Sequence, residues 1–172
     1  NALAFDRDGG IVVAGSLQGT ADFGAGPISR RRQDDGLTVR LDAAGKPLWT
    51  YRAEGVGGDA HYALALSSSG EVYVGGAFSG TLDFGGGVVL GEKETSPKDA
   101  FVVALGVDGV HRWSYGFGGP TRRDAVADLV VDRDENLYVG GLFGETMTVA
   151  GSTFVSNGST ERFLVSFDST GK

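Results

Sequence analysis

The sequence has no cysteine, only 4 prolines and only 2 histidines in 172 residues. The lack of cysteine excludes a disulfide framework and a thiolate metal site, but it does not fix the compartment. His61 and His111 have no partner residues at the spacing of a metal site or a Ser-His-Asp triad. No apolar run reaches the ~18 residues that a membrane-spanning helix needs, so we expect no membrane span. We therefore predict no cofactor, no metal and no catalytic residue in this chain.

The charge balance is also one-sided. The formal net charge is −7 and the sequence pI is about 4.7. A net-acidic surface repels phosphate backbones, which argues against nucleic-acid binding. The basic cluster Arg30, Arg31 and Arg32 does not change this, because Asp34 and Asp35 follow at once.

Glycine is abundant, with 30 residues spread between short runs of Val, Leu, Phe and Tyr. This pattern indicates many tight turns between strands, so we expect an all-β fold.

One outline recurs along the whole chain. Gly15, Gly76 and Gly141 correspond, 61 and 65 residues apart, and Trp49 and Trp113 are 64 residues apart. The corresponding segments read ALAFDRDGGIVVAG, ALALSSSGEVYVGG and DLVVDRDENLYVGG. A period this long indicates supersecondary units that stack on a shared core. The expected boundaries of the three repeats in this single domain are 1–61, 62–125 and 126–172.

Each repeat divides into four expected strands. In the middle copy they cover residues 64–66, 72–75, 101–105 and 112–115, with a small hairpin of 81–84 against 88–90. Residues 63–66 and 101–105 are apolar on both faces, which is typical of strands that are covered on both sides. The blades of a β-propeller meet this condition, since each packs against two neighbours. A parallel β-helix is the alternative, but its rungs are usually far shorter than sixty residues.

Side-chain size along the repeat fits the same prediction. The first strand carries alanines, where blades converge on an axis, and the last carries Trp113 and Tyr115, where blades spread apart. We therefore expect about three four-stranded blades, with the first strand of each innermost. We expect the third blade to lack its outermost strand.

The repeat resembles the bacterial SBBP-type β-propeller repeat of secreted and cell-surface proteins. The matching motifs are ALSSSGEVYVGG, GTLDFGGG, DAFVVALGVDG and the Trp-Ser-Tyr strand in the middle copy. The first copy has AFDRDGGIVVAG, GTADFGAG and LWTY, whereas the third departs at GETMTVAG. The resemblance implies a propeller fold and an extracellular, cell-surface or periplasmic location. A weaker resemblance, through LDAAGKPLWTY alone, is to PQQ-type propeller repeats.

Three repeats are too few for a closed ring, because propellers typically have 4 to 8 blades. We expect either that the chain is a portion of a larger propeller or that copies of it join to complete one.

Several motifs that suggest chemistry have simpler interpretations. Asp22-Phe23-Gly24 and Asp83-Phe84-Gly85 match a kinase triplet without the other kinase motifs, so we interpret them as structural. The acidic segments that begin at Asp6 and Asp132 lack the glutamate of a calcium-binding loop, and we expect tight turns there. Asp59 and Asp124 recur ahead of the first strand, where a carboxylate that accepts backbone N–H bonds would fix the crossing between blades.

Positions shared by the copies are explained by the blade, so a function would use loop positions that differ. The structural repeat positions are Trp49, Trp113, Asp59, Asp124, Gly15, Gly76 and Gly141. The candidate partner-contact residues are Arg30, Arg31, Arg32, Asp34, Asp35, His61, Arg122 and Arg123. The preferred prediction is a non-catalytic, extracytoplasmic module that binds a protein or carbohydrate. The alternatives are a structural subunit of a surface assembly and a portion of a propeller enzyme whose active site lies on other blades.

Overall fold

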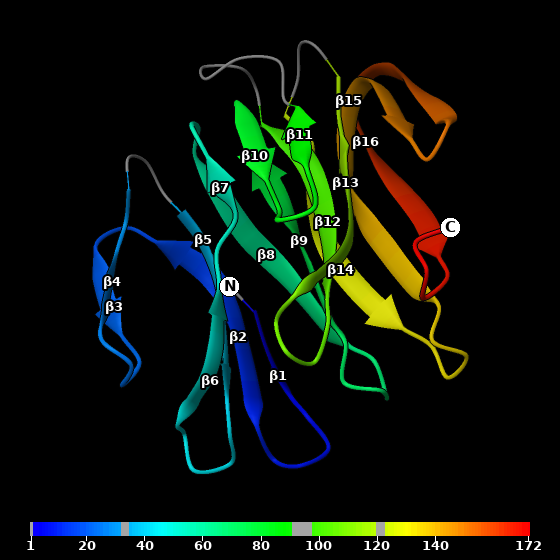
Figure 1. Ribbon diagram of the computed structural model, residues 1–172. Helices are drawn as coiled ribbons and strands as arrows, with labels where there is room; N and C mark the ends of the chain where they lie inside the picture. Colours follow the sequence, from blue (N-terminus) through cyan, green and yellow to red (C-terminus); the bar gives the residue numbers. More distant parts are fainter. Residues whose placement is uncertain (1, 32–34, 91–97, 120–122) are drawn as a thin grey trace.

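The computed structural model describes residues 2–31, 35–90, 98–119 and 123–172 (Figure 1). These residues form antiparallel sheets joined by turns, so the all-β prediction is confirmed. In the described part of the chain, no helix is long and apolar enough to cross a membrane.

The first sheet contains four strands in the order β1-β2-β5-β6. They are β1 (Ala2–Phe5), β2 (Ile11–Leu17), β5 (Asp35–Leu41) and β6 (Pro47–Tyr51). Between β2 and β5 a separate hairpin pairs β3 (Thr20–Asp22) with β4 (Pro27–Ser29).

The second sheet repeats this order as β13-β12-β9-β8. Its strands are β8 (Asp59–Leu66), β9 (Val72–Phe78), β12 (Asp99–Leu105) and β13 (His111–Phe117). The connecting hairpin of β10 (Thr81–Asp83) and β11 (Val88–Leu90) gains a third strand, β7 (Glu54–Gly55), from the link that precedes β8. These four strands and the hairpin confirm the strands expected for the middle repeat.

The third sheet has three strands, β14-β15-β16. They are β14 (Ala125–Val131), β15 (Leu137–Val149) and β16 (Ser152–Phe167). Here the connecting hairpin is continuous with the sheet, because β15 and β16 stay paired beyond an irregularity at Gly144 and Thr146.

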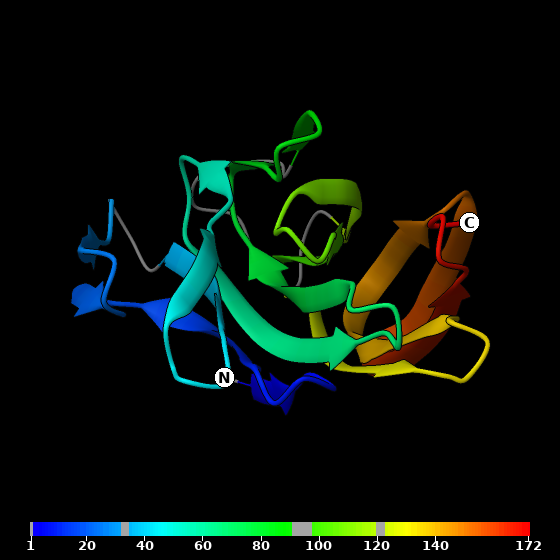
Figure 2. The same cartoon turned by 60° about the horizontal axis from the view of Figure 1, so that its bottom comes forward.

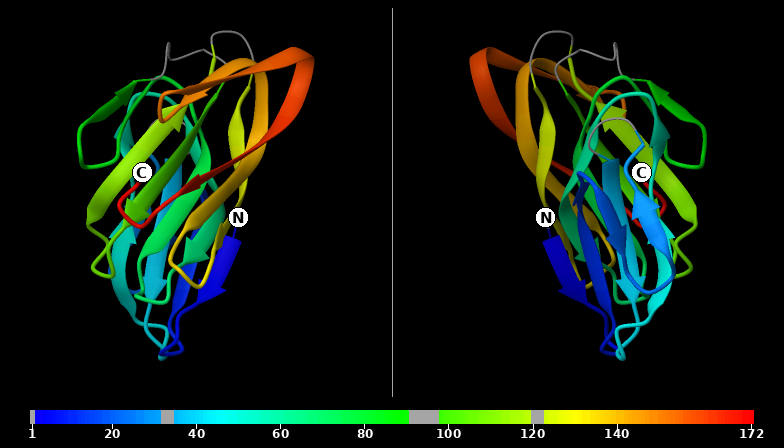
Figure 3. Two further views of the ribbon diagram at one scale, coloured as in Figure 1. Left: turned by 90° about the vertical axis from the view of Figure 1, so that its right-hand side faces the viewer. Right: turned by 90° about the vertical axis from the view of Figure 1, so that its left-hand side faces the viewer.

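The three sheets stand side by side in chain order (Figures 1 and 2). The first strands lie close together, because β8 contacts both β1 and β14. The turns that join β1 to β2, β8 to β9 and β14 to β15 lie at one end of the molecule, at the bottom of Figure 1, and the β10–β11 hairpin lies at the other (Figure 3). The described residues do not form a closed ring.

The second sheet is buried on both faces, as its sequence predicts. Val103 and Phe101 of β12 face the first sheet, whereas Val102 and Ala104 face the third, and all four side chains are fully buried. The second sheet therefore shares one apolar core with each neighbour. No other described part of the chain covers the outer faces of the first and third sheets in this way.

Candidate functional site

The first-to-second-strand turns of the three repeats have related backbone structures. The Asp6 carboxylate accepts hydrogen bonds from the N–H groups of Asp8 and Gly10, at 2.9 and 2.7 Å. Asp132 accepts equivalent bonds from two N–H groups of its own turn, and Ser67 Oγ accepts one from Glu71 N–H at 3.0 Å. The prediction that these segments form tight turns is therefore confirmed.

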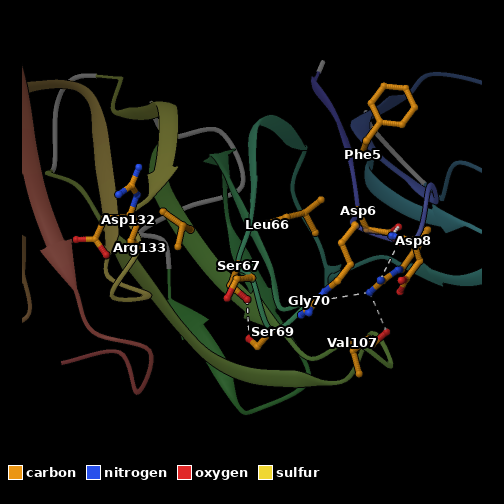
Figure 4. Close-up of a pocket in the computed structure, with 14 residues that line it drawn as sticks. Phe5, Asp6, Asp8, Leu66, Ser67, Ser69, Gly70, Val107, Asp132 and Arg133 are labelled. Atoms are coloured by element: carbon orange, nitrogen blue, oxygen red, sulfur yellow. Dashed lines mark hydrogen bonds and ion pairs between the residues drawn. The ribbon is translucent and has the colours of Figure 1, made fainter.

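A pocket of about 940 Å³ lies where these turns meet. Asp6 and Asp8 lie on one side of it, Asp132 and Arg133 on the other, and Ser67 and Ser69 between them (Figure 4). Val107 from the β12–β13 turn completes the wall. The lining residues are Phe5, Asp6, Arg7, Asp8, Arg40, Leu66, Ser67, Ser68, Ser69, Gly70, Val107, Val131, Asp132 and Arg133.

Arg40 is the one buried cation among these lining residues. Its guanidinium donates to Asp6 Oδ2 at 2.9 Å and to the carbonyl oxygens of Gly70 and Val107 at 3.2 and 3.3 Å. Burial alone would raise the pKa of Asp6, but the bonds from Gly10 N–H and Arg40 lower it overall. Arg40 Nε is buried and has no hydrogen-bond partner among the residues that the structure describes. Through these hydrogen bonds, Arg40 links a turn of the first repeat to two turns of the second repeat beside the pocket.

Glu135 joins the second and third repeats in the same way. Its carboxylate accepts bonds from the Ser68 N–H, at 3.0 Å, and from the Ser68 hydroxyl. Glu135 has a left-handed backbone with a φ of 67°. The equivalent turn positions in the first and second repeats are Gly9 and Gly70, with φ of 81° and 91°. A left-handed backbone costs about 1 kcal/mol for a residue with a side chain, so the repeat carries a strained residue at the turn that contacts its neighbour.

The pocket rim combines donors and acceptors of both charges. Arg7, Arg133 and Asp8 are exposed, and Ser68 and Ser69 add hydroxyl groups. Such a surface suits a polar ligand with many hydrogen-bonding groups better than an apolar or strongly charged one. Within the described ranges, no group of three or more His, Cys, Asp or Glu side chains is arranged so that it could hold a metal ion.

A second polar cluster is buried between the first and second sheets. Thr38 Oγ1 lies 2.9 Å from His61 Nδ1, and His61 Nε2 lies 3.8 Å from Asp59 Oδ2. Burial lowers the pKa of His61 to about 3. A hydrogen bond with the Leu37 backbone acts in the opposite direction but is the smaller effect. His61 is therefore neutral at pH 7.

Burial also dominates the titration of Asp59, and raises its pKa to about 7. The charge of Asp35 adds to this increase, whereas the Gly36 N–H bond, Lys98 and Arg52 oppose it. The Gly36 N–H donates to Asp59 Oδ2 at 2.7 Å, so Asp59 links its own sheet to β5 of the first sheet.

Two of the contact residues expected from the sequence are buried instead. His61 lies within β8 with 0% exposure, and Asp35 begins β5 with 8% exposure. The interpretation of these two residues as loop contacts is therefore wrong. His61 fills a space between two sheets, and Asp35 accepts a bond from Arg31 N–H at 2.7 Å and lies 3.5 Å from Arg52.

Of the other expected contact residues, the three that the structure describes, Arg30, Arg31 and Arg123, do not line the pocket. Arg30 is exposed, Arg31 pairs with Glu54, and Arg123 donates to the Tyr62 hydroxyl at 3.1 Å. Arg32, Asp34 and Arg122 lie outside the described residues.

The two tryptophans make the same contact in successive repeats. Trp49 Nε1 donates to the Val107 carbonyl at 2.9 Å, and Trp113 Nε1 donates to the Ser169 carbonyl at 3.2 Å. Each ring also packs on a turn glycine, Gly109 and Gly171 respectively.

Among the other structural repeat positions, Gly76, Gly141 and Asp124 lie at close contacts. A Cβ atom at Gly76 or Gly141 would overlap a carbonyl oxygen of the first strand. Gly15 holds the equivalent place in β2 and lines a groove on the outer face of the first sheet. Asp124 accepts bonds from Gly119 N–H and Gly144 N–H at 3.0 and 2.9 Å, and burial raises its pKa.

The acidic segments are predicted from the sequence as turns, but the pocket that these turns form together is not predicted. A signal was present, since the same turn reads Asp-Arg-Asp in the first and third copies and Ser-Ser-Ser in the second. Variation at one repeated position marks residues that the shared frame does not require.

The comparisons with known proteins leave the family open. No family model matches the chain. The chain is 34% identical over 156 residues to the "Regulatory protein FlaEY" of Caulobacter vibrioides. The match covers 85% of this chain but 16% of the relative, so the chain spans about a sixth of that protein's length.

Proposed function

We propose that the chain is a segment of a β-propeller that acts as a non-catalytic binding module. Three observations support the propeller: the strand order recurs, neighbouring sheets pack face to face, and β8 contacts the first strands of both other sheets. The resemblance to SBBP-type repeats remains a prediction.

The pocket between the turns is the observation that carries the binding role. Three equivalent turns converge on it, and the middle turn carries Ser-Ser-Ser where the other two carry Asp-Arg-Asp. Its mixed charges and hydroxyl groups suit a carbohydrate or a polar segment of a protein. The Caulobacter relative is named a regulatory protein, which fits a binding role better than a catalytic one.

Arrays of immobilised oligosaccharides and polar peptides, followed by titration calorimetry of the hits, test this proposal. We expect Arg7→Ala and Arg133→Ala to weaken binding of a true ligand by about tenfold or more, because each removes a charged donor. Arg30→Ala is the matched control, since Arg30 is exposed but does not line the pocket. Binding that is equally insensitive to all three substitutions, or no hit in either array, would refute the proposal.

An extracytoplasmic location is part of the proposal and rests on the SBBP resemblance. Fractionation of the source bacterium with an antibody against the chain tests it, and a signal confined to the cytoplasm would refute it.

A further inference from the structure

We infer that the outer face of the first sheet is the docking surface for one further repeat of the same kind, which precedes β1 in the polypeptide and stacks its tryptophan on Gly45. The inference rests on the repeat packing of the proposed propeller, and it is independent of any ligand in the pocket.

The first observation concerns the glycines on which tryptophans stack. Gly109 lies under Trp49 and Gly171 under Trp113, so close that an added Cβ atom would lie 2.7 and 2.8 Å from the rings. Gly45 occupies the same place in the first repeat. Its φ is 80°, and those of Gly109 and Gly171 are 77° and 82°. Its Cβ position faces open space, with no described atom within 4 Å. The Ala43 carbonyl corresponds to the Val107 and Ser169 carbonyls that accept the indole N–H bonds.

The second observation concerns the connecting hairpins. In the second repeat, β7 from the preceding link pairs with β10 and completes a three-stranded sheet. In the third repeat, Gly119 of the preceding link packs against the Thr146 carbonyl. The hairpin of β3 and β4 has two strands within the described residues, so β3 offers its edge to an equivalent link.

The third observation concerns the apolar surface. Leu3, Phe5 and Val13 are 63%, 68% and 37% exposed. Their counterparts Leu64, Leu66 and Val74 pack into the core between the first and second sheets. A groove of about 230 Å³ beneath β3, lined in part by Leu17 and Phe23, corresponds to the region that Phe78 and Phe84 occupy in that core. The outer face of the first sheet thus has the residues of a repeat interface.

A second copy of this chain fits the surface less well than a preceding repeat. The two tryptophans of each copy already stack on Gly109 and Gly171. The exposed face of the third sheet comes from β14, β15 and β16, which carry no tryptophan. A protein as long as the Caulobacter relative, of which this chain spans 16%, has room for such a repeat.

A tandem chain tests the inference, with a second copy of residues 1–61 joined ahead of Asn1 so that its tryptophan can reach Gly45. We expect the midpoint of thermal unfolding to rise and the β3 amide protons to exchange more slowly than in the 172-residue chain. Replacing the added tryptophan by alanine should lower the midpoint by about 5 °C or more, as should Trp49→Ala at the occupied site.

An unrelated 61-residue domain at the same position is the control, and should change neither quantity. If the added tryptophan can be replaced without effect while Trp49→Ala is destabilising, the inference is wrong. It is also wrong if the 172-residue chain forms oligomers that protect β3, since a second copy would then be the occupant. Phe5 belongs both to the pocket wall and to this surface, but Arg7 and Arg133, on which the binding test depends, are not part of the surface, so the two proposals fail separately.

Discussion

At the scale of single residues, the buried Thr38, His61 and Asp59 distinguish one repeat interface from the other. The corresponding positions between the second and third sheets are Val102, Val126 and Asp124. The carboxylate is common to both interfaces, whereas the hydroxyl and the imidazole replace two valines. Two titratable groups with opposite pKa shifts thus lie 3.8 Å apart at the first interface.

These opposite shifts predict compensating effects of pH on stability. The raised pKa of Asp59, about 7 against 3.8, stabilises the fold at low pH, and this contribution is lost as pH rises through 7. The lowered pKa of His61, about 3 against 6.5, stabilises the fold above pH 6.5, and this contribution is lost as pH falls through 3. Between about pH 4 and 6.5 the folded chain holds one proton on Asp59 and the unfolded chain holds one on His61. The two contributions should cancel there.

Denaturant unfolding between pH 4 and 7 should separate the two groups. The double variant Thr38→Val/His61→Val keeps only the Asp59 contribution. Its free energy of unfolding, relative to that of the wild type, should therefore fall as pH rises, by up to about 1.4 kcal/mol per pH unit. That of Asp59→Asn should rise with pH by a similar amount up to about pH 6.5. Curves parallel to that of the wild type for both variants would show that neither shift exists.

The adjacent glycines Gly140 and Gly141 of β15 test how closely β15 packs against its neighbours. Gly141→Ala should destabilise the fold by about 2 kcal/mol or more, because its Cβ atom would overlap the Ala125 carbonyl oxygen and the Phe163 ring. Gly140→Ala is the control, since its Cβ atom would lie 4.0 Å from the nearest atom, the Asp128 carbonyl oxygen. Chemical denaturation measures both, and equal losses would contradict the role assigned to Gly141.

At the scale of elements, the strands were predictable and the pocket was not. Runs such as Phe-Val-Val-Ala-Leu at 101–105 are apolar on both faces, so their burial follows from local pattern. His61 was misplaced because its surroundings come from Thr38 and Asp59, and the nearness of Thr38 depends on how the sheets pack. The pocket likewise depends on turns more than 60 residues apart, which no local pattern brings together.

The contact between a tryptophan and a turn can be isolated with two equivalent glycines. Gly45→Ala and Gly109→Ala carry the same backbone penalty of about 1 kcal/mol, since both have a left-handed φ near 80°. Gly109→Ala must also displace Trp49 and weaken its bond to Val107, so we expect it to cost about 1 to 2 kcal/mol more. Thermal unfolding with Trp fluorescence compares them, and equal costs in the 172-residue chain would argue that the ring contributes nothing.

At the scale of the whole molecule, stability should decrease from the middle sheet outward. In repeat architectures each unit contacts only its neighbours, and a unit with two neighbours gains two interfaces. The second sheet is covered on both faces, whereas Leu3 and Phe5 of the first and Val130 and Leu164 of the third are exposed.

Equivalent valines quantify this difference between sheets. Val74→Ala should cost about 2 kcal/mol, because Val74 is fully buried, and Val13→Ala should cost well under 1 kcal/mol, because the same position in the first sheet is 37% exposed. Hydrogen exchange should show the same order, with the amides of β9 and β12 protected more strongly than those of β1, β2 and β14. Uniform protection across the three sheets would mean that the chain unfolds as one unit. In that case the repeats would not act as separate layers, and a further repeat at Gly45 would stabilise the middle sheet as much as the first.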